Sequence, residues 1–173
     1  MPDATTTAPD PLHAASSSMP SHAPRLAALA AHLQAMPPVA ALGVSVAGFD
    51  GATLRLRAPL AANVNDKGCA FGGSLASLMT LAGWGVVTLH VEAAGLQADV
   101  FVADSQVRYR APVFEDLEAV AMRDPDEPGG WDAFLESLRT RGRARIVVRA
   151  EARLADGTLA TDSTARFVAI ARA

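Results

Sequence analysis

The chain has 173 residues, a formal net charge of −3 and a hydrophobic share of 50%. A domain of about 150 residues buries roughly 70% of its unfolded surface, so we expect one domain that needs no disulfide or metal. The acidic balance excludes the broad basic surface of a nucleic-acid-binding protein. The single cysteine, Cys69, excludes an internal disulfide and fits a reducing cytoplasm.

The first 23 residues are rich in Pro, Ala, Ser and Thr. They lack the basic and apolar regions of a secretory signal, so the sequence predicts a disordered leader over 1–23. A single domain over 24–173 would follow. With one cysteine and four histidines, the sequence predicts no metal site and no cofactor.

The first predicted element is a helix over 24–36, because Leu26, Leu29, Leu33 and Met36 recur at helical spacing. The prolines at 37 and 38 should end it. A strand over 40–49 and a second over 53–60 flank an Asp-Gly turn, which predicts a hairpin.

Residues 63–85 are the most informative stretch. A polar loop over 61–71 leads into a predicted helix from about Gly73 to Ala94, and no charged side chain lies between Lys67 and Glu92. The run is long enough for a membrane span. Its many glycines and the alternating strands on both sides favour a helix buried inside the protein instead.

The rest of the chain is predicted to form mostly strands. The clearest alternation runs from Arg143 to Leu154, with apolar residues on one face and arginines on the other. The predicted strands cover 98–113, 117–122, 143–154 and 158–170, with an amphipathic helix over 131–140. This order predicts an α+β fold, in which a curved antiparallel sheet of five or six strands wraps a long central helix.

The start of the long helix suits acyl-transfer chemistry. Backbone N–H groups and the positive end of the helix dipole at Gly73 would face whatever the polar loop holds. Such groups stabilise a carbonyl oxygen that becomes negative in the transition state. Close helix–strand packing explains the glycine pair Gly72–Gly73 equally well.

Six short motifs occur in one order along residues 25–171. They are Asn63-Val-Asn-Asp-Lys-Gly, Ala70-Phe-Gly-Gly-Ser, Leu81-Ala-Gly-Trp-Gly, Val102-Ala-Asp-Ser, Arg108-Tyr-Arg-Ala-Pro and Arg141-Gly-Arg-Ala-Arg-Ile. With this element order, the chain resembles hotdog-fold proteins. It is most similar to the putative thioesterase family found as the C-terminal domain of YiiD-type acetyltransferases.

The resemblance implies a homodimer that acts on acyl-CoA or acyl-carrier thioesters. Two such dimers could associate into a tetramer. The thioester would lie in a tunnel at the subunit interface, with its oxygen on the Gly73 amide. Gly72, Ser74 and Phe71 would line the substrate site beside it. The chain would then be a thioester hydrolase. The alternative is a hotdog module that binds acyl-CoA without cleaving it.

The identity of the catalytic base stays open at this stage. Related thioesterases carry Asp or Glu where this chain has Thr80, which could orient a water or bond its own helix. Asn65 would orient water or shape a turn. Asp66 and Asp104 are the remaining carboxylates, and each also has a structural explanation: a solvated turn for Asp66, an ion pair with Arg108 or Arg110 for Asp104.

Two further residues complete the predicted substrate site. Asn63 is assigned to substrate binding, although a structural role in the loop is favoured. Arg149 lies on the arginine face of the strand over 143–154. That face is either simply solvated or, in part, a site for the phosphates of CoA. A dehydratase is disfavoured, because the loop holds no histidine.

Overall fold

The computed structural model describes residues 22–172, so residues 1–21 of the predicted leader lie outside the described part. Its helices are α1 (Ala23–Ala35), α2 (Pro37–Ala41), α3 (Gly72–Ala93) and α4 (Gly130–Arg141), with a short 3-10 turn over Leu60–Ala62. Its strands are β1 (Ser45–Phe49), β2 (Thr53–Ala58), β3 (Ala98–Tyr109), β4 (Leu117–Arg123), β5 (Arg143–Arg153) and β6 (Leu159–Ala171).

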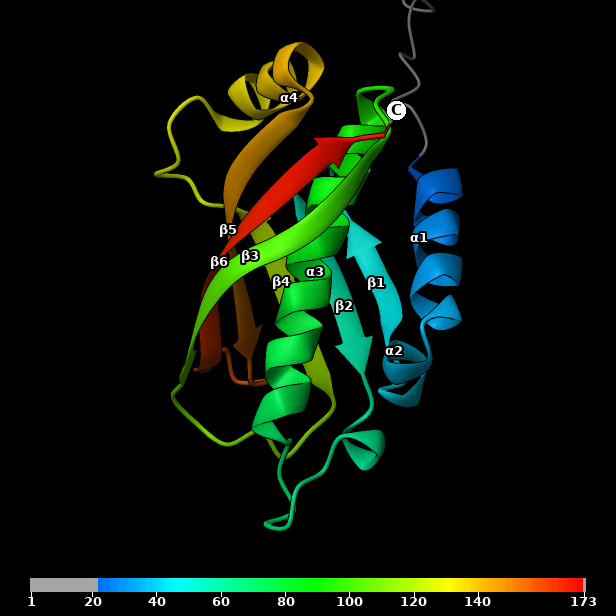
Figure 1. Ribbon diagram of the computed structural model, residues 1–173. Coiled ribbons are helices and arrows are strands. Elements are labelled where there is room, and N and C mark those ends of the chain that lie inside the picture. The colour runs from blue at the N-terminus through cyan, green and yellow to red at the C-terminus, as the bar shows by residue number, and fades with distance from the viewer. Residues whose placement is uncertain (1–21, 173) are drawn as a thin grey trace, which may run out of the picture.

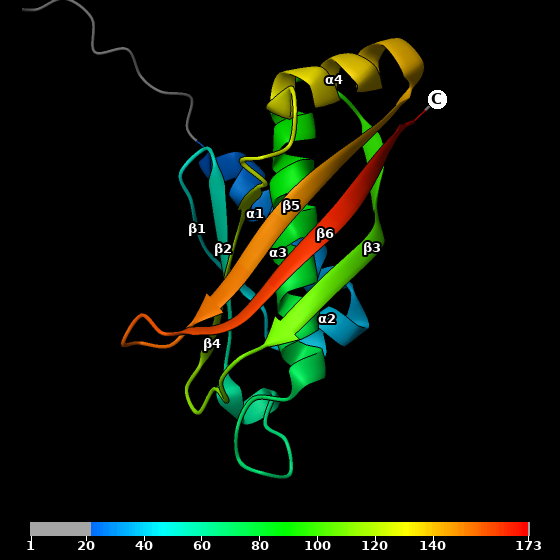
Figure 2. The same cartoon turned by 90° about the vertical axis from the view of Figure 1, so that its left-hand side faces the viewer.

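The strands form one antiparallel sheet in the order β1-β2-β4-β5-β6-β3. The sheet curls around α3, while α1 packs beside β1 and α4 lies over one end of the molecule (Figure 1). The loop before α3 lies at the opposite end from α4, and β3 forms an outer edge of the sheet (Figure 2). The predicted α+β fold with a wrapped central helix is confirmed.

Helix α3 sits deep in the sheet because two glycines allow it to approach. A Cβ at Gly83 would lie 2.8 Å from the ring of Phe167, and one at Gly85 would lie 2.5 Å from Leu54. Among the described residues, α3 is the one helix long and apolar enough to cross a membrane, and 61% of its most apolar window is buried in this fold. Its length and composition are those of a core helix.

The alternating apolar residues of β5 face the core, as the sequence pattern predicted. Its alternate residues are buried: Ala144, Ile146, Val148, Ala150 and Ala152. The helix before β5 ends where expected, at Gly142, which has φ +67° and whose N–H donates to the Leu138 carbonyl.

The strand predicted over 40–49 is partly wrong. Residues Pro37–Ala41 form the short helix α2, and the strand begins only at Ser45. The prolines end α1 as predicted, but a proline in the first turn of a helix loses no backbone hydrogen bond and its φ already fits. The Pro-Pro pair therefore starts a new helix instead of leading into the strand.

His90 lies near the C-terminal end of α3, in an aromatic cluster. Its ring stacks on Trp131 of α4 with 3.8 Å between centroids and contacts the edge of Phe49 at 6.1 Å. Its Nε2 atom is buried without a hydrogen-bond partner in the described residues. Burial, helped by the charge of His22, lowers the pKa of His90 from 6.5 to about 4.

We predict that acid destabilises the fold through His90. The unfolded chain binds this proton near pH 6.5 and the folded chain only near pH 4, so the free energy of unfolding should decrease as pH drops between these values. After allowance for solvent screening of this half-buried ring, the loss is on the order of 1–2 kcal/mol at pH 4.5.

The substitution His90→Phe should flatten this pH dependence while keeping the stack on Trp131. Denaturant unfolding of both proteins from pH 8 to pH 4 measures the effect. Equal slopes for wild type and His90→Phe between pH 6.5 and 4 would contradict the assignment.

Candidate active site

The N-terminus of α3 is open. The helix begins at Gly72, the preceding Phe71 provides no side-chain cap, and the first backbone bond runs from the Leu75 N–H to the Phe71 carbonyl, 3.1 Å. Within the described residues, the N–H groups of Gly72, Gly73 and Ser74 have no acceptor. Three donors at the positive end of a 22-residue helix form a ready site for an oxyanion.

Asn63 anchors the loop before α3. Its side chain is 3% exposed, and its Nδ2 donates to the carbonyls of Leu42 (2.9 Å) and Pro59 (2.8 Å). The backbone carbonyl of Asn63 accepts the Phe71 N–H at 2.7 Å. These bonds tie the two ends of the loop together, which is the structural role favoured for Asn63.

Asn65 organises the middle of the same loop. Its Oδ1 accepts the N–H of Lys67 at 2.8 Å and of Cys69 at 3.3 Å, the pattern of an Asx turn. Asp66 beside it has an 80% exposed side chain whose partner is Lys67, at 3.1 Å. The Asp66 carboxylate therefore lies in solvent.

Aromatic rings flank the open helix end. The Tyr109 hydroxyl donates to the Gly72 carbonyl at 2.9 Å. The exposed ring of Phe71 lies over Gly73, so close that a Cβ there would be 2.3 Å from it. A cavity of about 270 Å³ opens between Gly72, Leu75, Tyr109 and the chain segment 110–113. The helix end therefore has an adjoining space that a small group can enter.

Thr80 shares a helix face with Gly73, because seven residues make almost two full turns. It is half-buried. The same incompletely covered stripe continues along α3 through Ser77, Leu81, Trp84 and Thr88. Leu78 and Met79, on the other side of the helix, are fully packed in the core.

Asp104 and Arg149 do not lie at the start of α3. Asp104 pairs with Arg166 of β6 at 3.3 Å, not with Arg108 or Arg110, which both pair with Asp162. Arg166 alternates with the core residues of β6, so this pair is on the face of the sheet turned away from α3.

Arg149 is held by two carboxylates, Asp126 at 2.7 Å and Asp124 at 2.9 Å. Its hydrogen bond to Asp126 raises the pKa of Arg149 further above its usual range. The Arg149 guanidinium is therefore already paired with two carboxylates, and its position needs no bound phosphate to explain it.

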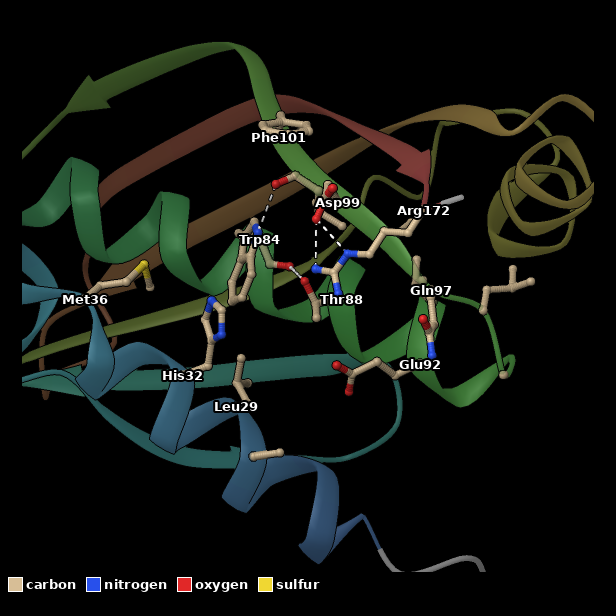
Figure 3. Close-up of a pocket in the computed structure, with 16 residues that line it drawn as sticks. Leu29, His32, Met36, Trp84, Thr88, Glu92, Gln97, Asp99, Phe101 and Arg172 are labelled. Carbon is tan, nitrogen blue, oxygen red and sulfur yellow. Dashed lines mark hydrogen bonds and ion pairs between the residues drawn. The ribbon is translucent and has the colours of Figure 1, made fainter.

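A second and larger cavity lies away from the loop. It measures about 770 Å³ and opens between α1, the second half of α3 and the start of β3 (Figure 3). Its lining includes His32 and Trp84, whose rings stack at 5.2 Å, and Glu92. No role for His32 was predicted from the sequence, because nothing in its spacing places α1 beside the far half of α3. Among residues 22–172, no three His, Cys, Asp or Glu side chains lie close enough to hold a metal ion.

One edge of the sheet, strand β3, is unpaired within the described chain. The bonds Arg172 N–H to Gln97 carbonyl and Arg110 N–H to Ala160 carbonyl fix which β3 residues face β6. By the antiparallel alternation, the backbone groups of Val100, Val102, Ser105, Val107 and Tyr109 point outward. The Val100 carbonyl is taken by Trp84 Nε1 at 3.1 Å, which leaves the segment 102–109 open.

Comparison with known proteins gives one family and one fold. A family model described as "Putative thioesterase (yiiD_Cterm)" matches residues 26–171. The structure is similar to a putative thioesterase from Shewanella oneidensis, with 26% identity and a TM-score of 0.73, covering 84% of this chain and 96% of that one. A protein of unknown function from Chlorobaculum tepidum TLS has 24% identity, a TM-score of 0.79 and coverage of 86% and 95%.

A third similar structure comes from Pseudomonas aeruginosa and is described as a protein of unknown function and probable thioesterase. It has 22% identity, a TM-score of 0.71 and coverage of 84% and 96%. The hotdog fold expected from the sequence is thereby confirmed.

We predict that Asn63→Ala destabilises the protein. The change removes a buried amide and its two hydrogen bonds to the Leu42 and Pro59 carbonyls, which costs roughly 1–3 kcal/mol of unfolding free energy. Denaturant unfolding measures it. Lys67→Ala, at a 74% exposed side chain in the same loop, is the control and should stay within about 0.5 kcal/mol of wild type. Equal stability of the two variants would show that Asn63 does not anchor the loop.

Proposed function

The chain belongs to the family described as "Putative thioesterase (yiiD_Cterm)", and on this basis we propose that it hydrolyses acyl-CoA or acyl-carrier thioesters. The observation that carries the proposal is the uncapped start of α3, where Gly72, Gly73 and Ser74 present free N–H groups. A thioester oxygen on these donors would gain negative charge during attack and be stabilised there.

In the proposed reaction, water attacks the thioester carbon and the thiol leaves. Thr80, on the same helix face as Gly73, has a hydroxyl that can orient the water. Asn65 shapes the loop that holds the donors in place. Asp66 and Asp104 stay outside this proposal, because one lies in solvent and the other is paired on the far face of the sheet.

We further propose that the protein acts as a homodimer joined through β3. An unpaired edge strand invites pairing with another chain. Large apolar side chains accompany this edge, since Phe101, Val102 and Tyr109 are each between 45% and 56% exposed. Pairing of two copies would cover them. A cytoplasmic location is part of the proposal and rests on Cys69, which is a free, buried thiol.

A binding module without turnover is the second candidate, favoured by the lack of a carboxylate at Thr80. Acyl-CoA would then raise the melting temperature of the protein. No thiol would be released. The thiol-release assay below separates the two functions.

Removing one N–H from the helix start tests the proposed site. Proline is tolerated in the first turn of a helix, so Gly73→Pro should fold but lack one donor. We expect wild type to release thiol from at least one member of a panel of short, medium and aromatic acyl-CoAs. Gly73→Pro should lower kcat by about 10²–10³.

Gly73→Ala is the matched control for this test. It displaces Phe71 in the same way but keeps the N–H, and should therefore keep most of the activity. Equal rates for Gly73→Pro and Gly73→Ala would count against the amide, and no release by wild type on any thioester would count against hydrolysis.

A proline on the outer edge of β3 tests the dimer. The Ser105 N–H points away from β6, so Ser105→Pro breaks no bond within the described chain but blocks pairing. We expect wild type to sediment as a dimer, Ser105→Ala likewise, and Ser105→Pro as a folded monomer. A dimer that persists in Ser105→Pro would exclude this interface.

A further inference from the structure

The 770 Å³ cavity has the size of a small-molecule site and holds the groups that the α3 N-terminus lacks. It lies on the side of the sheet occupied by α3, and its polar side chains come from α1, α3, β3 and the end of the chain after β6 (Figure 3). The residues that matter here are His32 from α1, Trp84, Thr88 and Glu92 from α3, and the ion pair of Asp99 with Arg172, 2.8 Å.

His32 is fixed in this cavity by ring stacking, and its ring nitrogens make no hydrogen bond within the described residues. Its ring stacks on Trp84 at an interplanar angle of 20°, and Trp84 is fixed in turn by its bond to Val100. His32 makes no hydrogen bond within the described residues, so its ring nitrogens are free for water or substrate. The Thr88 hydroxyl donates to the Trp84 carbonyl at 2.9 Å and keeps its lone pairs.

Within one chain this imidazole is far from the proposed oxyanion donors. Trp84 follows Gly73 by eleven residues, which is roughly 16 Å along the helix axis. In a dimer, the His32 ring of one copy could lie closer to the N–H donors of the other copy. Antiparallel pairing of segment 102–109 with itself would bring the other copy's Tyr109, which is bonded to Gly72, opposite the region of Val102. Val102 is two residues, about 7 Å, from the carbonyl that holds Trp84.

We propose that His32 of one subunit is the general base for the thioester bound at the α3 N-terminus of the other subunit, an inference that rests on the proposed function. A neutral ring nitrogen takes a proton from the attacking water, and the new C–O bond forms. The C–S bond then breaks, and the imidazolium returns the proton to the leaving thiolate. The carboxylic acid product loses its proton to solvent.

The assignment also explains the residue types around His32. An imidazole is the side chain best suited to exchange protons near neutral pH. The charged groups that face it are Glu92 on α3, with no partner in the described residues, and the Asp99–Arg172 pair at the rim. The Trp84 indole provides a flat apolar surface on which both the imidazole and an acyl group can rest.

The first test compares His32→Gln with wild type over pH 5–9 on an accepted acyl-CoA. We expect kcat to fall about 10²–10⁴-fold with little change in KM, and the acid limb of the pH profile to disappear. Imidazole added to His32→Ala should restore part of the rate. His22→Gln, at the start of the same helix but outside the cavity, is the control and should behave as wild type, and melting curves verify folding of all variants.

The second test asks whether the site is shared between subunits. His32→Gln and Gly73→Pro are each assayed alone and then after mixing and re-equilibration. A shared site predicts recovery to about a quarter of wild-type activity, because half the dimers are mixed and each mixed dimer has one intact site. A site within one subunit predicts no recovery.

The outcomes separate the two proposals. Wild-type turnover with an unchanged kcat and pH profile in His32→Gln overturns the role of His32 and leaves the thioesterase function standing. Loss of activity in Glu92→Gln but not in His32→Gln does the same. Absence of thiol release by wild type overturns both. Failure of the mixed dimers to recover overturns the division between subunits.

Discussion

The close approach of α3 to the sheet is the constraint on which the rest of the molecule depends. At Gly83 and Gly85 the helix lies so near Phe167 and Leu54 that no Cβ fits without movement. Because packed interiors tolerate little change in volume, this contact fixes the depth and the rotation of the helix. It thereby fixes where the helix starts, which residues form the uncovered stripe, and how far the sheet must curl.

The fold was largely predictable because its signals are local. The alternation in β5 and the apolar spacing of α1 each depend on neighbouring residues and on one buried face. The Pro-Pro pair was the exception. A proline marks a boundary reliably, but the same fixed φ that ends one helix suits the first turn of another, so the sequence could not tell which conformation follows.

The candidate site was less predictable because its contacts are tertiary. The sequence predicted a helix start near Gly73, which is a local feature, and a structural role for Asn63, although one acceptor of the Asn63 amide, Leu42, lies 21 residues away. It could not show that Arg149 meets Asp124 and Asp126, or that Asp104 meets Arg166, because these partners lie on neighbouring strands or loops. For the same reason His32, 29 residues before the start of the loop at residue 61, had no recognisable role in the sequence.

A core helix this tightly packed restricts where catalytic groups can stand. A carboxylate on the buried face of α3 would need partners that an apolar core does not provide. Polar chemistry is therefore confined to the open first turn, the uncovered stripe and the elements that lie against that stripe. If Thr80 provides no base, the base has to come from one of those neighbouring elements, and α1 is the one that places an imidazole there. The base proposed on α1 would satisfy this restriction, because α1 lies against the uncovered stripe and not within the packed core.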